Sequence, residues 1–249
     1  MLAHIHIMKT AGQTVCNILR TSFGANHCDL RCGDLATRND IEFARRFYPN
    51  LQSIGGHSIR PRGDLLDVPS IRFFTFLRDP IARCLSHYQF EVNRNKRNVD
   101  FLQWLEQNAD YQTRILSRTR EPQIAIEVLE QRVAFVGLVE DFDRSLSLLR
   151  AWGGLCSVAH YKSRNIASDN SVTEQILASP ELVRAIQESH HADRMVYDHV
   201  VNVIYPRMIE RYTDVSVIEK QSASQVWPAV KRALLYKPFA KTRQRLRAA

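Results

Sequence analysis

The segment 8–14 (MKTAGQT) brings a cation, two hydroxyls and a glycine together just before an expected helix. Backbone amides at a helix N-terminus have no partners within the helix and lie at its positive end, so they attract anions, and Lys9 adds a full charge. The segment lacks the GxxxxGK[ST] order of the common nucleotide loop, because Lys9 precedes Gly12. On composition alone, an anion site and an ordinary turn with a surface lysine are equally consistent with it.

The segment 78–88 (RDPIARCLSHY) is a second candidate for binding an anion. Its Asp-Pro pair is typical of the N-cap and first position of a helix, which puts Arg78 at the end of the preceding strand. The guanidinium fork of Arg78 suits a phosphate group, and Arg83 and Ser86 share one face of the expected helix. The alternative is a capped helix with surface arginines, and Arg83 is the weaker of the two arginine candidates.

His57 is the candidate for a general base. It follows an apolar stretch in the segment 53–58 (SIGGHS), and an imidazole titrates near neutral pH. Glu91 is a weaker candidate for this role, and a loop histidine with a structural hydrogen bond is the alternative for His57. His4 and His6 share one face of the expected first strand, where buried, hydrogen-bonded rings are favoured over a metal pair.

Apolar runs alternate with amphipathic helix patterns along the chain. Strands are expected at 2–8, 52–56, 71–77 and 133–139. Helices are expected before Gly24, after residues 79 and 141, and at 100–108, 122–131, 172–178, 180–188 and 189–212. Parallel strands need such crossover connections, so the pattern predicts an α/β fold with a parallel sheet flanked by helices. Ligands bind such sheets beyond the carboxyl ends of the strands, which places the loops at 8–14, 56–63 and 78–80 on one functional edge.

The formal net charge of +8 lies mostly at the C-terminal end of the 249 residues. From Gln221 onward there is no acidic residue, and the basic residues are Lys231, Arg232, Lys237, Lys241, Arg243, Arg245 and Arg247. The nearly neutral remainder argues against binding of nucleic acid. The tail is expected to form a helical extension that touches a membrane surface or a partner, or else to lie exposed.

Two smaller groups of basic residues are candidates for contacting an acidic glycan, with a solvated surface as the alternative. They are Arg60 and Arg62 after His57, and Arg94, Lys96 and Arg97 after the helix that follows Pro80.

The sequence shows no sign of export or membrane insertion. No apolar run approaches the roughly 20 residues of a membrane span, and the N-terminus lacks a secretory signal. A cytoplasmic location is therefore expected, provided the chain is complete. The five cysteines are sparse and odd in number, which favours reduced thiols, and Cys28 and Cys32 lack a second ligand pair for zinc. No metal site is expected.

Together the two anion-binding segments resemble the motifs of the sulfotransferase superfamily, in particular the branch of heparan-sulfate and related carbohydrate O-sulfotransferases. That family's 5′-phosphosulfate loop is typically PKTGGT or PKTAGT, and its 3′-phosphate motif is RDPxxRxxSxY. This chain departs from the pattern at Met8, where proline is usual, and at Gln13, where threonine or serine is common. Segments 135–142 (FVGLVEDF) and 193–197 (DRMVY) are similar to later parts of the family.

The resemblance implies a P-loop-like sulfotransferase domain over residues 1–213, followed by a basic C-terminal extension at 214–249. It implies 3′-phosphoadenosine-5′-phosphosulfate (PAPS) as donor, a hydroxyl acceptor such as a carbohydrate, and no metal. His57 would be the base and Lys9 would neutralise the bridging oxygen. The implied donor-binding residues are Lys9, Thr10, Ala11, Gly12, Gln13, Thr14, Arg78 and Ser86.

Two other functions are left open by the residues. One is an ATP-dependent P-loop kinase, against which the position of Lys9 and the lack of an evident magnesium carboxylate argue. The other is a non-catalytic protein that binds glycans or a membrane surface.

Overall fold

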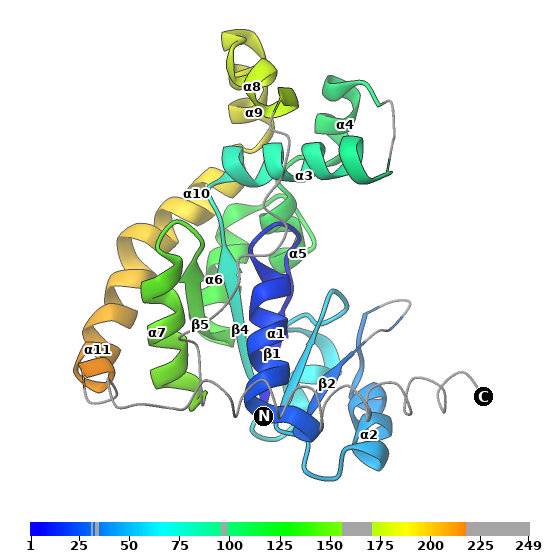
Figure 1. Ribbon diagram of the computed structural model, residues 1–249, viewed down its shortest axis with the longest axis vertical. Helices are drawn as coiled ribbons and strands as arrows, with labels where there is room; N and C mark the ends of the chain where they lie inside the picture. The colour runs from blue at the N-terminus through cyan, green and yellow to red at the C-terminus, as the bar shows by residue number, and fades with distance from the viewer. Residues whose placement is uncertain (31, 33–34, 96–98, 156–170, 218–249) are drawn as a thin grey trace.

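One parallel sheet of five strands forms the centre of the protein (Figure 1). The computed structural model describes residues 1–30, 32, 35–95, 99–155 and 171–217. The strands lie in the order β2-β3-β1-β4-β5, and all neighbouring pairs are parallel. Their bounds are β1 Leu2–Ile5, β2 His27–Asp29, β3 Ser53–Gly56, β4 Arg72–Leu77 and β5 Val133–Leu138. The parallel α/β fold expected from the sequence is confirmed, although the three-residue β2 is too short to have been recognised from its pattern.

Helices connect and flank these strands. Their bounds are α1 Gly12–Phe23, α2 Arg38–Phe47, α3 Pro80–Asn95, α4 Phe101–Gln107, α5 Tyr111–Ser117, α6 Pro122–Arg132, α7 Phe142–Gly153, α8 Ser171–Leu177, α9 Pro180–Ser189, α10 His191–His199 and α11 Tyr205–Val217. A single π-helical turn over Val200–Ile204 joins α10 to α11. Sequence patterns did not predict α2 or α5. Helix α2 is mostly polar and buries only two residues, Ile41 and Ala44, but Thr37 and Asp40 form a capping box at its start.

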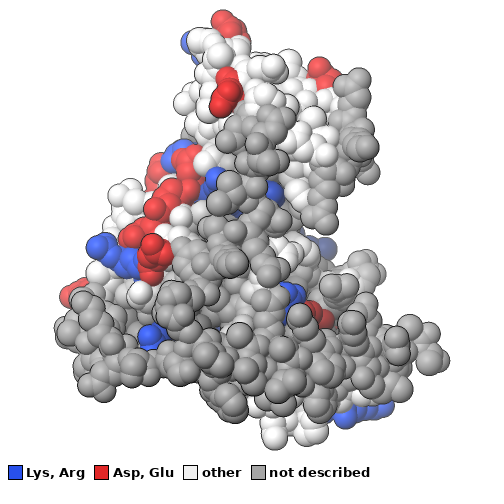
Figure 2. All heavy atoms as spheres, in the orientation of Figure 1, with Lys and Arg blue, Asp and Glu red and all other residues white. Residues whose placement is uncertain are grey.

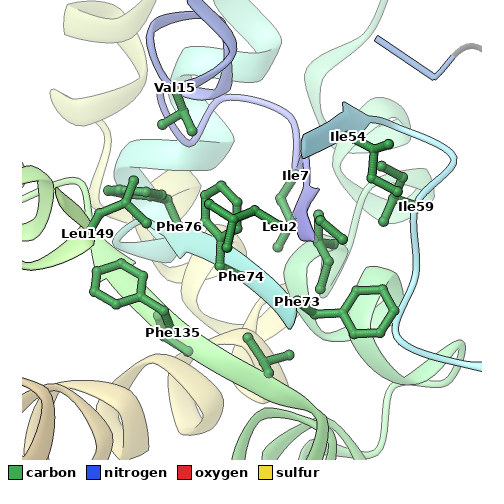
Figure 3. Packing of buried hydrophobic residues seen from close by; sticks show 14 of the residues in the cluster. Leu2, Ile7, Val15, Ile54, Ile59, Phe73, Phe74, Phe76, Phe135 and Leu149 are labelled. Atoms are coloured by element: carbon green, nitrogen blue, oxygen red, sulfur yellow. The ribbon is translucent and has the colours of Figure 1, made fainter. Parts of the chain in front are cut away.

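Aromatic residues of β4 and β5 form a large part of the core (Figure 3). Phe73, Phe74 and Phe76 on β4 and Phe135 on β5 are all almost completely buried. Successive residues of a strand point to opposite faces, so burial of both Phe73 and Phe74 requires that both faces of the sheet are covered. This explains why the strands appear in the sequence as continuous apolar runs rather than alternating ones.

A second, smaller core lies in four helices, α3, α4, α8 and α9, which we call the helical cap. Its buried residues are Cys84, Leu85, Tyr88, Phe101, Trp104, Leu105, Ile176 and Ile186. In Figure 1 the cap lies at the top of the molecule, beyond the carboxyl end of β4, which leads directly into α3. The cap therefore overhangs the edge of the sheet at which ligands are expected.

The strand register brings the predicted functional loops to one edge. Ile5 at the end of β1 is paired with Gly56 at the end of β3 and with Thr75 on β4. Leu77 at the end of β4 is paired with Leu138 at the end of β5. The segments that follow these four strands consequently emerge side by side, as the sequence predicted for those after β1, β3 and β4.

The C-terminal part of the described chain is a long, charged helical region. Helix α11 ends at Val217, and the remainder of the predicted basic extension, 218–249, lies outside the described residues, so the boundary at 213 stays a prediction. Figure 2 shows charges of both signs on this flank. Arg194 and Asp198 form one ion pair in this region, and Arg207 and Glu130 form another. Among the helices described, none is both long and apolar enough to cross a membrane.

Candidate functional site

The loop between β1 and α1 has an unusual backbone. Lys9 and Ala11 adopt left-handed conformations with φ of 67° and 58°, which non-glycine residues rarely do. Thr10 between them is fully buried, and its hydroxyl donates a hydrogen bond of 3.1 Å to the carbonyl of Ile7. Helix α1 then begins at Gly12 without a side-chain cap. Strained residues of this kind concentrate at ligand sites, and uncapped amides at a helix start favour an anion.

Gly12 is required by a close neighbour. A Cβ atom at this position would overlap Cδ2 and Nε2 of the His6 ring, so no larger residue fits while that ring keeps its place. The first residue of α1 is therefore in direct contact with His6, the residue directly after β1. Gln13 is exposed and Thr14 is buried in the first turn of the same helix.

The two anion-binding segments meet at the edge of the sheet. Nη1 of Arg78, directly after β4, donates a hydrogen bond of 3.3 Å to the carbonyl of Lys9. Nζ of Lys9 lies 4.6 Å from the centre of the Phe90 ring on α3. Ser86 is half-buried four residues before Phe90, and residues at this spacing share a helix face. Arg78 thus meets the loop after β1 at Lys9, and Ser86 lies on the face of α3 that carries Phe90.

Gln112 holds the backbone of Arg78 in place. Its side-chain oxygen accepts from the Arg78 N–H at 3.0 Å, and its side-chain nitrogen donates to the Arg78 carbonyl at 2.8 Å. Gln112 is almost completely buried, so both bonds are shielded from water. Partial burial lowers the pKa of Arg78, and the nearby carboxylates of Glu140 and Asp79 oppose this change. A half-buried cation beside a left-handed loop is suited to an anionic ligand.

Two aspartates anchor Gln112 from the opposite side. Asp193 on α10 accepts hydrogen bonds from the N–H groups of Gln112 and Thr113 at 3.1 and 2.7 Å. Asp110 in turn accepts from the N–H groups of Ala192 and Asp193 at 3.0 and 3.1 Å. Each carboxylate therefore binds the first amides of the other's helix, a favourable arrangement for negative charge. These hydrogen bonds join the N-terminal ends of α5 and α10 and fix the position of Gln112, which holds the backbone of Arg78.

Asp79 joins three segments that the sequence analysis singled out separately. Its N–H donates to Oε1 of Glu140 at 2.9 Å, and its carboxylate accepts from Arg194 of α10. The hydroxyl of Tyr197 donates to the second oxygen of Glu140 at 2.7 Å. Segments 78–88, 135–142 and 193–197 are therefore one hydrogen-bonded unit, whose effect is to support the strand end that carries Arg78.

His57 has the geometry of a general base. Its Nδ1 lies 3.0 Å from the carbonyl oxygen of His6, and since a carbonyl only accepts, Nδ1 carries the proton and Nε2 has the lone pair. Desolvation lowers the pKa of His57, the hydrogen bond to His6 opposes this change, and the charge of Arg60 adds to it. The lowered pKa keeps the imidazole neutral at physiological pH. The residue is also exposed, so the ring is accessible to an acceptor.

His6 lies directly beneath this base. The two rings stack with their centres 3.9 Å apart and their planes at 24°. His6 is only 7% exposed, and desolvation, followed by the influence of His57, lowers its pKa to about 3. His6 is therefore a neutral, buried ring. The burial expected for His4 and His6 is confirmed, but His6 lies just after β1, and Nε2 of His4 has no hydrogen-bond partner among the described residues.

Arg83 and Glu91 are placed differently from Arg78 and His57. Arg83 is completely buried, with Nη2 donating to Nε2 of His190 at 3.3 Å and its guanidinium 4.8 Å from the centre of the Tyr111 ring. Arg83 therefore links α3 of the helical cap to His190 and to Tyr111 at the start of α5, and it does not face the loop after β1. Glu91 lies on α3, where its Oε1 is 3.9 Å from Nε2 of His87.

Arg60 lies near the base, and Arg62 lies near Arg60. Arg60 is 8% exposed and donates to the carbonyl of Ile59 at 2.7 Å. Nε and Nη1 of Arg62 are buried without a hydrogen-bond acceptor among the described residues. Desolvation and the charges of Arg118 and Arg60 lower the pKa of Arg62 to about 10. Three guanidinium groups thus repel one another here, which favours a negatively charged partner. The side chains of Arg94, Lys96 and Arg97 lie outside the described residues.

Within the described part of the chain, no group of three or more His, Cys, Asp and Glu side chains is arranged to hold a metal ion. Cys28 is buried and Cys32 is partly buried.

Sequence reasoning missed Gln112 and His6 as parts of the site. Gln112 lies in a helix that was not predicted, and it contacts Arg78 across 34 positions of the chain. His6 was interpreted only as a buried strand residue. The signal that could have been used is that His6 lies two residues before the segment 8–14, while His57 directly follows another strand of the expected sheet.

Residues 1–200 match the model of a family described as the sulfotransferase family. A solved structure of a sulfotransferase from Alicyclobacillus acidocaldarius is similar at 13% identity with a TM-score of 0.39, covering 76% of this chain and 95% of that chain. None of the curated proteins matches the sequence.

Proposed function

The chain belongs to the sulfotransferase family, and from this premise we propose that it transfers a sulfuryl group from PAPS to a hydroxyl of a carbohydrate acceptor. The observation that carries the proposal is the hydrogen bond from Arg78 to the carbonyl of Lys9. PAPS has anionic groups on the 3′ and 5′ positions of one ribose, so its recognition needs two cationic sites close together. The contact between the two segments supplies that proximity.

The residues at the edge of the sheet fit the two ends of such a donor. Lys9 and the amides from Ala11 to Gln13, at the start of α1, suit the 5′-phosphosulfate. The N–H of Thr14 already donates to the carbonyl of Ala11 at 2.9 Å. Arg78 and Ser86 suit the 3′-phosphate. The hydroxyl of Thr10 bonds to the Ile7 carbonyl, so only its backbone amide is left for the donor.

Each step of the transfer has a residue in reach of it. Nε2 of His57 takes the proton of the acceptor hydroxyl as the acceptor oxygen forms its bond to sulfur. The bond from sulfur to the bridging phosphate oxygen breaks, and Lys9 neutralises the charge that develops on this oxygen. The acceptor proton ends on His57, which releases it to water after product leaves.

The charges near His57 favour an acidic acceptor. Arg60 and Arg62 follow the base in sequence, and a carboxylate or sulfate bound beside them offsets the repulsion that Arg118 and Arg60 exert on Arg62. A glycan that already carries acidic groups supplies both the hydroxyl and these anions.

The decisive experiment measures transfer of radiolabelled sulfate from PAPS to a panel of glycans, lipids and tyrosine peptides, with wild type, His57→Ala and His191→Ala. We expect incorporation into a glycan, a loss of about 10²- to 10⁴-fold in His57→Ala with donor binding kept, and no change in His191→Ala, whose ring is exposed on α10. Incorporation into peptide alone would exclude a carbohydrate acceptor. Tighter binding of ATP with magnesium than of 3′-phosphoadenosine-5′-phosphate would exclude the donor, and wild-type turnover of His57→Ala would exclude the base.

A further inference from the structure

Three rings stack beneath the proposed base, which is the fourth ring of the column. Phe74 on β4 packs on His4 of β1 with ring centres 4.9 Å apart, His4 on His6 at 5.5 Å, and His6 on His57 at 3.9 Å. All three interplanar angles are 24° or less. His4 and His6 are two residues apart in extended backbone, so both rings lie on the same face of the sheet. The column therefore runs from the core to the functional edge, and His57 is its last member.

The ring of His6 contacts both the base and the donor loop. Its face lies against His57, while its Cδ2 and Nε2 occupy the space that a side chain at position 12 would need. Its backbone carbonyl also accepts a hydrogen bond from Nδ1–H of His57. His6 thus determines the tautomer of the base through its backbone, and the position of the base relative to Gly12 through its ring.

The column is uncharged at the pH at which a histidine base works. Burial lowers the pKa of His4 well below its usual value and that of His6 to about 3. Among the described residues, Arg60 is the charged group that acts on His57, and its charge lowers the pKa of His57. A neutral His6 adds no repulsion when His57 takes a proton, and its ring shields one side of the base from water.

We propose that His6 is a positioning residue that sets the distance and orientation of His57 relative to the donor loop at Gly12. The catalytic part of this inference rests on the proposed sulfuryl transfer, whereas the geometric part is independent of it. A base displaced by an ångström costs about 10²-fold in rate, so the column has to be rigid to be effective.

Two replacements of His6 separate its ring from its charge. His6→Ala removes the ring but keeps the backbone carbonyl, and we expect kcat to fall about 10- to 100-fold while the affinity for 3′-phosphoadenosine-5′-phosphate stays within about threefold. The acid limb of the kcat/KM profile should move to higher pH, because His57 regains solvent and its pKa rises toward 6.5. His6→Phe restores a stacked ring and should recover most of the turnover and the wild-type pH profile.

The contact with Gly12 gives a second test that does not rely on one variant folding. Gly12→Ala forces the His6 ring aside and should lower kcat, but the same change in a His6→Ala background has room for the new Cβ. The double variant should therefore be no slower than His6→Ala alone, a strongly non-additive result. Additive losses would mean that the ring does not transmit the contact, and the proposal would be withdrawn.

Histidine NMR spectra distinguish failure of this inference from failure of the proposed function. Nitrogen-15 shifts report the tautomer and pKa of His57 in the protein without any donor. We expect the Nδ1-protonated tautomer in wild type and a raised His57 pKa in His6→Ala. An unchanged pKa in His6→Ala overturns the positioning role even if sulfate is transferred. If instead wild type transfers no sulfate but the pKa rises as expected, the geometry stands and the reaction assignment fails.

Discussion

The side chain of Gln112 forms hydrogen bonds with both backbone groups of Arg78, at 3.0 Å to its N–H and 2.8 Å to its carbonyl. A glutamine amide thereby replaces the strand neighbour that Arg78 has lost beyond the end of β4. Arg78 can turn its guanidinium toward the loop after β1 because its backbone is held from behind.

Replacing Gln112 should weaken the proposed 3′-phosphate site. Gln112→Met keeps the volume but leaves two backbone groups of Arg78 without partners, so we expect a loss of about 1–3 kcal/mol in unfolding free energy. Calorimetry should show weaker binding of 3′-phosphoadenosine-5′-phosphate, with little change for adenosine 5′-phosphate, which lacks the 3′ group. Gln103→Met, at an exposed position on α4, is the matched control. Equal losses for both nucleotides would argue for a general folding defect.

Lys9 should contribute to turnover more than to binding. In Lys9→Met we expect kcat to fall about 10²- to 10³-fold, because the charge on the leaving oxygen develops only in the transition state. The dissociation constant of 3′-phosphoadenosine-5′-phosphate should rise by about tenfold or less, equivalent to 1.4 kcal/mol. Arg132→Met removes an exposed charge next to the start of β5, at the opposite edge of the sheet, and should leave both quantities unchanged. A loss confined to binding would remove Lys9 from the chemical step.

Arg62 should select acidic acceptors. In Arg62→Ala we expect KM for a sulfated or carboxylated glycan to rise about 10- to 100-fold, the equivalent of a hydrogen bond to a charged group. KM for a neutral sugar acceptor should change little, and added salt should weaken the preference of wild type for acidic acceptors. Arg45→Ala removes an exposed arginine from α2 as a control. Equal KM changes for acidic and neutral acceptors would contradict this role.

Acid should destabilise the protein partly through His87. Desolvation, with the charges of Arg83 and Lys9, lowers the pKa of this buried ring to about 3. Below a pH of about 6.5 the unfolded chain binds a proton at His87 that the folded chain does not, so stability falls as pH drops toward 3, by up to about 1.4 kcal/mol per pH unit.

His87→Phe tests this dependence while keeping an aromatic ring between Trp104 and Tyr111. We expect a smaller decrease in unfolding free energy between pH 6 and pH 4.5 than in wild type, measured by urea denaturation. The absolute stability of the variant is not the readout, because Arg83 also loses a possible acceptor, Nδ1 of His87, at 3.5 Å. Identical slopes would show that His87 is not the titrating group.

Much of the architecture was determined by the sequence alone. The apolar runs that became β1, β3, β4 and β5, and the Asp-Pro start of α3, are local signals, and they were sufficient to predict a parallel sheet with the loops after three strands on one edge. The same local signals marked the loop at Lys9, Arg78 and His57 as candidates. Short or polar elements escaped, because β2 spans three residues and α2 buries only two.

The relationships among these residues were decided only by the tertiary structure. Arg78 meets Lys9 across 69 positions of the chain, and His57 meets His6 across 51. Periodicity and capping patterns describe neighbours along the chain, whereas these hydrogen bonds depend on strand order and register, which bring distant strand ends together. For the same reason Arg83 on α3 was a candidate, though the weaker one, for binding the anion, and only the structure shows that it is fully buried with His190 as its partner.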